Sequence, residues 1–168
     1  MRVILITGGC RSGKSDYAEK LALGMAPNPI YVATARIWDQ DFALRVERHK
    51  ARRGPQWTNI EEEKHLGNLN FPSRVVLVDC LTLWATNYFF DMNSDPDTCL
   101  AAMKRELDQM LAHDATYILV TNEIGLGGIG ENELQRRFTD LQGSINQYAA
   151  ERADEVIMMI SGIPVKLK

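Results

Sequence analysis

The chain has 168 residues, of which 45% are apolar, so it can form one buried core and is short for two ordinary domains. We therefore expect a single domain over residues 1–168. The formal net charge of −3 is spread over segments of mixed sign, which argues against a basic face that follows a nucleic-acid backbone. No apolar run approaches the roughly 20 residues of a membrane-spanning helix, and the N-terminus leaves no room for a secretory signal. These features predict a cytoplasmic protein with neither a nucleic-acid partner nor a membrane span.

Apolar runs of strand length alternate with segments of helical spacing along the chain. Strands are predicted at residues 3–6, 29–33, 75–78, 117–120 and 155–160. Helices are predicted at residues 15–25, around 40–50, and at 96–113 and 133–152. Continuous β-branched runs are typical of strands that are covered on both faces. The order predicts an α/β fold with a mostly parallel sheet flanked by helices.

Two segments depart from this alternation. Residues 35–70 are rich in charged side chains, and apart from the helix near 40–50 they read as a long polar connection. A connection of this length in a compact domain is usually functional. At the C-terminus, a turn followed by a short edge strand is expected, because Pro164 would interrupt a central ladder.

Residues 8–15 match the phosphate-loop pattern GxxxxGK[ST] between a predicted strand and a predicted helix. They read Gly8-Gly9-Cys10-Arg11-Ser12-Gly13-Lys14-Ser15. Glycines let successive backbone amides point at phosphates, and the helix adds its positive dipole end. Lys14 is expected to contact the β- and γ-phosphates during transfer, and the hydroxyl of Ser15 to hold Mg²⁺. Asp79, at the end of strand 75–78, is the candidate partner for the metal, and it can also cap the next helix.

Three further polar residues are candidates for chemistry. His49 is surrounded by cations, which would keep its imidazole neutral and nucleophilic, although a solvated histidine on a charged helix is the simpler interpretation. Asn122 and Glu123 follow strand 117–120 and precede a glycine-rich run at 125–130. Ligands of open α/β sheets bind at the carboxyl ends of strands. Asn122 and Glu123 therefore either support substrate binding and catalysis or only cap a turn.

A set of motifs spans nearly the whole chain. Besides the phosphate loop it comprises Ala33-Thr34-Ala35, Arg48-His49-Lys50, Trp57-Thr58-x-x-Glu61, Thr121-Asn122-Glu123-Ile124-Gly125, Glu131-Asn132 and Ser161-Gly162-Ile163-x-Val165-Lys166. Together these motifs resemble the bifunctional adenosylcobinamide kinase / adenosylcobinamide-phosphate guanylyltransferase family of cobalamin biosynthesis. The resemblance implies a RecA-like P-loop fold and a homotrimer. It also implies two reactions, in which ATP or GTP phosphorylates adenosylcobinamide and GTP then gives GMP through a GMP-histidine to form adenosylcobinamide-GDP.

The same resemblance implies roles for individual residues. His49 matches the guanylylated histidine. The nucleotide contacts match Gly8, Gly9, Cys10, Arg11, Ser12, Gly13, Lys14, Ser15, Thr34, Ala35, Arg36, Lys50, Ala51, Arg52, Arg53, Glu61 and Leu81. The chain departs from the family at Cys10, where a small residue such as alanine is expected, at Asp79, where some members have glutamate, and in loop 125–130, which lacks an expected proline. Two rival functions stay open, namely a plain small-molecule P-loop kinase without a covalent intermediate and a nucleotide-dependent switch.

Overall fold

The computed structural model describes the backbone of residues 1–168 and the side chains of all residues except Phe42, Arg45, His49 and Arg52. The strands are β1 (Arg2–Gly8), β2 (Ile30–Ala33), β3 (Thr58–Glu61), β4 (Val75–Asp79), β5 (Thr116–Val120), β6 (Glu155–Ile160) and β7 (Ile163–Lys166). The α-helices are α1 (Lys14–Met25), α2 (Gln40–Arg52), α3 (Leu81–Asp91), α4 (Pro96–Leu111) and α5 (Glu133–Arg152), with short 3₁₀ turns at Leu66–Asn68 and Ile124–Gly127. Within these described helices, none combines the length and the apolar character that crossing a bilayer needs.

The strands form one seven-stranded sheet in the order β3-β2-β4-β5-β1-β6-β7. All neighbouring pairs are parallel except β6 and β7, which are antiparallel. Strand β5 separates β1, which carries the phosphate loop, from β4, which ends on Asp79. The predicted α/β fold with a mostly parallel sheet flanked by helices is confirmed. Strand β7 contains Pro164 and lies at the edge of the sheet, as expected.

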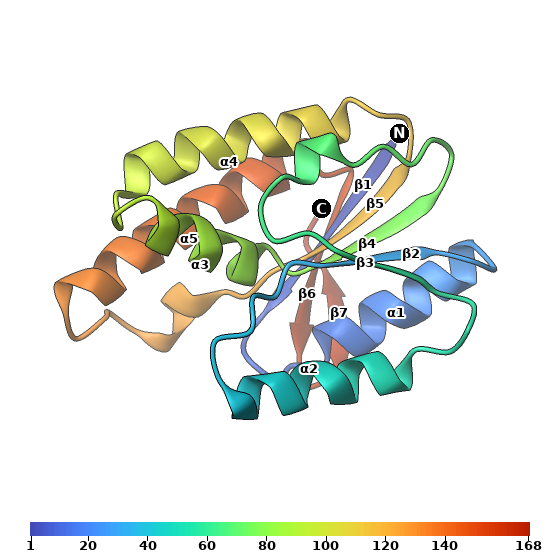
Figure 1. The fold of residues 1–168 in the computed structure, drawn as a ribbon, viewed down its shortest axis with the longest axis horizontal. Coiled ribbons are helices and arrows are strands. Elements are labelled where there is room, and N and C mark those ends of the chain that lie inside the picture. The colour runs from blue at the N-terminus through green and yellow to red at the C-terminus, as the bar shows by residue number, and fades with distance from the viewer.

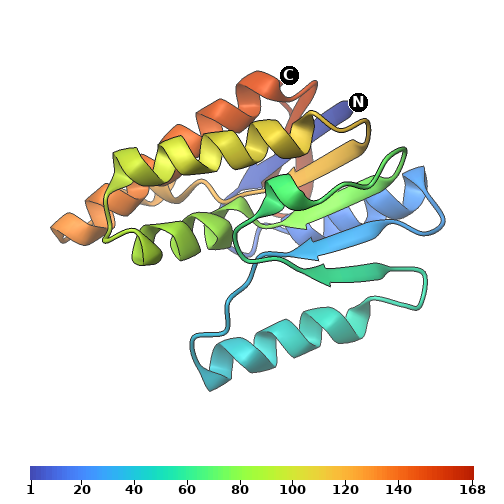
Figure 2. The same ribbon diagram turned by 45° about the horizontal axis from the view of Figure 1, so that its top comes forward.

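Helices cover both faces of the sheet (Figures 1 and 2). Helices α3, α4 and α5 lie on one face, whereas α1 lies on the other and α2 extends along the same side, next to the β3 edge. Each face has its own buried cluster. The larger cluster includes Trp84, Phe89 and Tyr117, and the smaller includes Ile6, Tyr31 and Trp57. The side chains of β1, β2, β4 and β5 alternate between these two cores, which fixes the register of the central sheet.

Two elements were missing from the sequence prediction. Helix α3 (Leu81–Asp91) is apolar nearly all round, and most of its side chains are buried, so it has no polar stripe to reveal a helical period. Strand β3 (Thr58–Glu61) lies within the predicted polar connection, where it forms the other edge of the sheet and has mostly exposed side chains. The prediction of a polar connection after α2 therefore missed the strand β3.

Candidate functional site

The carboxyl ends of the central strands meet at one edge of the sheet. Ala33 of β2 pairs with Asp79 of β4, and Asp79 pairs with Val120 of β5. A pocket of about 460 Å³ opens at this edge. It is lined by Cys10, Arg11, Ser12, Gly13, Lys14, Ser15, Asp16, Tyr31, Ala33, Ala35, Val46, Lys50, Arg53, Asp79, Cys80, Leu83, Val120 and Asn122. The fold thus brings the phosphate loop, Asp79, Asn122 and the end of α2 to one cavity.

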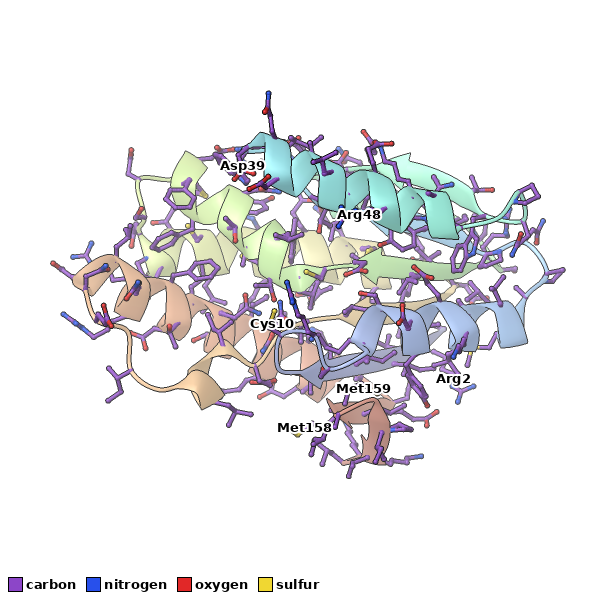
Figure 3. The ribbon with its side chains drawn as sticks, turned by 90° about the horizontal axis from the view of Figure 1, so that it is seen from below. Arg2, Cys10, Asp39, Arg48, Met158 and Met159 are labelled. Atoms are coloured by element: carbon purple, nitrogen blue, oxygen red, sulfur yellow. The ribbon has the colours of Figure 1, made fainter. Side chains whose placement is uncertain are left out.

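The phosphate loop forms one wall of the pocket. Gly13 has a φ of 91°, which an L side chain rarely adopts, and it stands immediately before α1. Lys14 is buried, and its Nζ donates hydrogen bonds to the carbonyl oxygen of Gly9 and, at 3.4 Å, to Oγ of Ser12. The ammonium group is thereby held across the loop that is expected to surround the phosphates. Figure 3 shows Cys10 on this loop, between α2 and the β6–β7 hairpin.

The hairpin supports the loop from the other side. The backbone amide of Gly162 donates to the carbonyl oxygen of Ser12 at 3.0 Å. Gly162 also lies close to Gly13, because a Cβ on Gly13 would be 3.3 Å from the Cα of Gly162. The Ser161-Gly162-Ile163 motif near the C-terminus therefore packs against the phosphate loop.

Asp79 and Tyr31 also line the pocket and contact each other. The hydroxyl of Tyr31 donates to Oδ2 of Asp79 at 2.9 Å, and the guanidinium of Arg53 lies 3.6 Å from the centre of the Tyr31 ring. Burial raises the pKa of Tyr31 well above its usual value, and the negative charge of Asp79 adds to this effect, so the phenol stays protonated and donates. Arg53 also donates from Nε to Asn59 at 2.8 Å and forms an ion pair with Glu19 of α1 at 3.9 Å.

Helix α2 brings cations to the pocket. Lys50 and Arg53 line it, and Lys50 forms an ion pair with Glu61 at the end of β3, which raises the pKa of Lys50. Two of the predicted site residues, His49 and Arg52, belong to α2, but their side chains lie outside those that the structure describes. Their positions on the helix place them next to lining residues.

Other predicted nucleotide contacts lie outside the pocket lining. Thr34 is buried, and its hydroxyl donates to the carbonyl oxygen of Cys80 and accepts from the Cys80 amide, both at 2.8 Å. Arg36 turns toward Glu63 and Asp91, with ion pairs of 2.7 and 2.8 Å. The remaining predicted contacts outside the lining are Gly8, Gly9, Ala51, Glu61 and Leu81. Their contacts with a nucleotide stay predictions.

Asn122 and Glu123 separate in the structure. Asn122 lines the pocket, and its backbone amide donates to Oγ1 of Thr82 at 2.9 Å. Glu123 turns away and accepts from Oγ1 of Thr7 at 2.6 Å and from Nδ2 of Asn146 at 3.2 Å. Glu123 thus joins a hydrogen-bonded network behind β1 and β5, whereas Asn122 is placed to meet a ligand.

The pocket fits a magnesium ion that is held mainly by a nucleotide. Ser15 and Asp79 line the same cavity as Lys14. Mg²⁺ is usually bound by one or two protein oxygens together with phosphates and water, rather than by a complete protein cage. Among the side chains that the structure describes, no cluster of three or more His, Cys, Asp or Glu could hold a metal. The hydroxyl of Ser15 in the phosphate loop and the carboxylate of Asp79 are therefore a donor set that fits a nucleotide-bound Mg²⁺.

Several lining residues were not singled out from the sequence, namely Asp16, Tyr31, Ala33, Val46, Cys80, Leu83 and Val120. Strand alternation places Tyr31 and Ala33 on one face of β2, which is the signal that could have pointed to Tyr31. Burial raises the pKa of Cys80 to about 12, so its thiol stays protonated. Cys10, Cys80 and Cys99 are all unpaired with other cysteines.

The chain is similar to known proteins along nearly its whole length. The family described as "Cobinamide kinase / cobinamide phosphate guanyltransferase" matches residues 4–167. The "Bifunctional adenosylcobalamin biosynthesis protein CobU" of Salmonella typhimurium is 41% identical and that of Escherichia coli 39%, each alignment covering 99% of both chains. The "Bifunctional adenosylcobalamin biosynthesis protein CobP" of Pseudomonas aeruginosa is 38% identical over 98% of this chain and 96% of its own. Among solved structures, the flagellar accessory protein FlaH of Methanocaldococcus jannaschii has a TM-score of 0.48 and 16% identity, over 99% of this chain and 78% of its own.

Proposed function

The chain belongs to the cobinamide kinase / cobinamide phosphate guanyltransferase family, and from this premise we propose how its residues carry out two successive phosphate transfers. It is a bifunctional enzyme of cobalamin biosynthesis with kinase and guanyltransferase activities. The kinase step phosphorylates adenosylcobinamide with ATP or GTP, and the second step adds GMP from GTP to give adenosylcobinamide-GDP. The observation that supports this assignment is the convergence of the phosphate loop, Asp79 and the cationic end of α2 on one pocket.

The kinase step uses the phosphate-loop wall. The backbone amides of residues 8–15 and the ammonium of Lys14 bind the β- and γ-phosphates and stabilise the charge that develops on the transferred group. Ser15 and Asp79 are the residues that would hold Mg²⁺, and the ion would neutralise charge on the phosphates of the nucleotide. The alcohol oxygen of the substrate attacks the γ-phosphorus as the bond from that phosphorus to the β–γ bridging oxygen breaks, so the hydroxyl proton is released and a nucleoside diphosphate leaves. Correct placement of the two reactants supplies a large part of the acceleration.

The guanylyl transfer uses α2. A ring nitrogen of His49 attacks the α-phosphorus of GTP, so that a nitrogen–phosphorus bond forms and pyrophosphate leaves. The phosphate of adenosylcobinamide phosphate then attacks the same phosphorus and releases the histidine. Lys50 and Arg53 follow His49 in sequence and line the pocket, so their charges would stabilise both transfers. A phosphate loop presents the γ-phosphate, whereas His49 needs the α-phosphate, so either α2 moves or GTP binds differently in this step.

The cellular setting and the assembly belong to the same proposal. The enzyme is cytoplasmic and works as a homotrimer, as the family resemblance implies. Sedimentation of the purified protein should then give three times the 19.0 kDa mass of the chain.

The decisive experiment traps the covalent intermediate. Purified protein is mixed with Mg²⁺ and GTP labelled at the α-phosphate, then denatured and analysed for an acid-labile GMP adduct by peptide mass spectrometry. We expect the adduct on His49, its loss in His49→Ala, and a retained kinase activity in that variant. His65→Ala is the matched control, because His65 is exposed and contacts Glu106 at a distance of 3.4 Å, outside the pocket lining.

Each other outcome selects a rival. A protein that binds GTP but forms no adduct would be a plain kinase. Slow GTP hydrolysis that is indifferent to cobinamide would indicate a nucleotide-dependent switch. Equal loss of both activities in a folded His49→Ala variant would contradict a separate role for His49.

A further inference from the structure

Tyr31 of β2 lines the pocket, where it contacts both Asp79 and Arg53. Its hydroxyl contacts the Asp79 carboxylate, and its ring faces the Arg53 guanidinium. We infer that Tyr31 is a positioning residue, which fixes Asp79 for the metal-bound nucleotide and fixes Arg53, and with it the end of α2, for guanylyl transfer. This inference rests on the proposed function of the pocket and adds a residue that connects its two reactions.

The hydroxyl side is set by the pairing of β2 with β4. Ala33 of β2 is paired with Asp79 of β4. Tyr31 lies two residues before Ala33 on the same face of β2, and its side chain is long enough to extend along that face to Asp79. The hydrogen bond of 2.9 Å engages Oδ2 of Asp79, and the other carboxylate oxygen can still bind a cation. A donor held by a buried ring restricts the rotation of the carboxylate before any ligand binds. Outer partners of this kind commonly tune metal affinity.

The ring side is set by packing around Arg53. The side chain of Arg53 is only 3% exposed, and that of its ion-pair partner Glu19 is 13% exposed. Trp57 packs edge-on against the other part of the Tyr31 ring, with the ring centroids 5.9 Å apart. Because Arg53 directly follows α2, its stacking on Tyr31 places the C-terminal end of that helix relative to Asp79. A desolvated guanidinium over an aromatic face is a strong contact of its kind.

Tyr31→Phe separates the two sides, because it removes the hydroxyl and keeps the ring. Mg²⁺ is expected to increase the affinity for GTP, and the midpoint of this effect is the Mg²⁺ concentration that gives half of the increase. Because Asp79 is no longer held in Tyr31→Phe, we expect this midpoint to rise about tenfold. This shift is measured directly by titrating Mg²⁺ against the binding of a fluorescent GTP analogue, without any turnover. Kinase activity should show the same shift and recover at saturating Mg²⁺.

Tyr117→Phe is the matched control. Tyr117 is also buried in a strand, and its hydroxyl donates to the Met110 carbonyl oxygen at 2.7 Å, in the core on the other face of the sheet. Both variants lose one buried tyrosine hydrogen bond, so a general loss of stability would affect both. Only Tyr31→Phe should alter the Mg²⁺ titration. Coincident Mg²⁺ titrations for Tyr31→Phe and the wild type would overturn the role of the hydroxyl.

Tyr31→Leu tests the ring. At saturating Mg²⁺, Tyr31→Phe should form the GMP adduct at the wild-type rate, whereas Tyr31→Leu should form it roughly tenfold more slowly, because Arg53 loses its aromatic face. Equal adduct rates for the two variants would overturn the ring's role. If the wild type itself neither phosphorylates cobinamide nor binds GTP with Mg²⁺, the proposed function fails. If the wild type does both and the variants match it, only the inference about Tyr31 fails.

Discussion

Gly8 closes the turn from β1 into the phosphate loop with a φ of 144°, and a Cβ at this position would lie 2.5 Å from the carbonyl oxygen of Met159 on β6. Both the backbone conformation and the close approach exclude a side chain. Gly8→Ala should therefore lower the free energy of unfolding by about 1–3 kcal/mol, measured by urea denaturation without nucleotide.

Gly9→Ala is the control at the adjacent position. A Cβ on Gly9 would have no atom within 4 Å, so its effect on unfolding should stay within about 0.5 kcal/mol. Equal destabilisation by the two substitutions would show that the neighbouring β6 backbone does not require a glycine at position 8.

Helix α5 is joined to β5 by a buried polar network. Oγ1 of Thr121 donates to Oδ1 of Asn146 at 2.6 Å, and Nδ2 of Asn146 donates to the carbonyl oxygen of Asn122 at 2.9 Å and to Glu123. Asn146→Ala leaves these groups without their partner. We expect a loss of about 2–3 kcal/mol in the free energy of unfolding, measured by chemical denaturation.

The next residue of α5 provides the comparison. Gln147 is exposed on the same helix, so Gln147→Ala should change the unfolding free energy by no more than about 0.5 kcal/mol. If Asn146→Ala changed the free energy of unfolding as little as Gln147→Ala, water would have to replace the hydrogen bonds of Asn146. The network would then not fix α5 against the sheet.

A charged cluster joins the segment before α2 to the end of α3. Asp91, the last residue of α3, accepts from Arg36 at 2.8 and 3.1 Å and from Lys64 at 2.9 Å. The hydrogen bonds from these cations hold the pKa of Asp91 well below its usual range, and Arg36 has the larger effect. Since the folded pKa is lowered, the carboxylate stabilises the fold above its unfolded-chain pKa of about 3.9. That stabilisation is lost as pH falls through the folded pKa.

Asp91→Asn tests this contribution by comparison with the wild type. Near neutral pH the variant should be less stable by about 1 kcal/mol, because a partly exposed ion pair is screened by solvent. Urea denaturation from pH 7 down to pH 3 should show the difference between the two proteins shrinking below about pH 4. A difference that stays constant over this range would mean that the charge of Asp91 does not contribute.

At the scale of the whole molecule, the pocket is built on one continuous sheet, at the carboxyl ends of its central strands. We predict one cooperative thermal transition, with kinase and guanyltransferase activities lost together. Mg²⁺ with GTP at 100 times its dissociation constant should add about 2.7 kcal/mol to stability, seen by calorimetry as a higher Tm. Lys14→Ala should abolish most of this increase. Two separate transitions, or one activity surviving the first transition, would contradict a single domain.

The sequence by itself determined the features that depend on neighbouring residues. The phosphate loop at residues 8–15, the carboxylate of Asp79 after a buried strand and the alternation of strands and helices all follow from local pattern, because backbone preferences and side-chain periodicity act over a few residues. The family motifs added His49, whose role stays a prediction. Only the tertiary structure decided which distant residues meet. Tyr31 contacts Asp79, 48 residues away in sequence, because β2 pairs with β4. In the same way, only the packed structure shows that α3 is buried on nearly every side. Strand pairing and burial are set by the packing of the entire chain, which no short window of sequence contains.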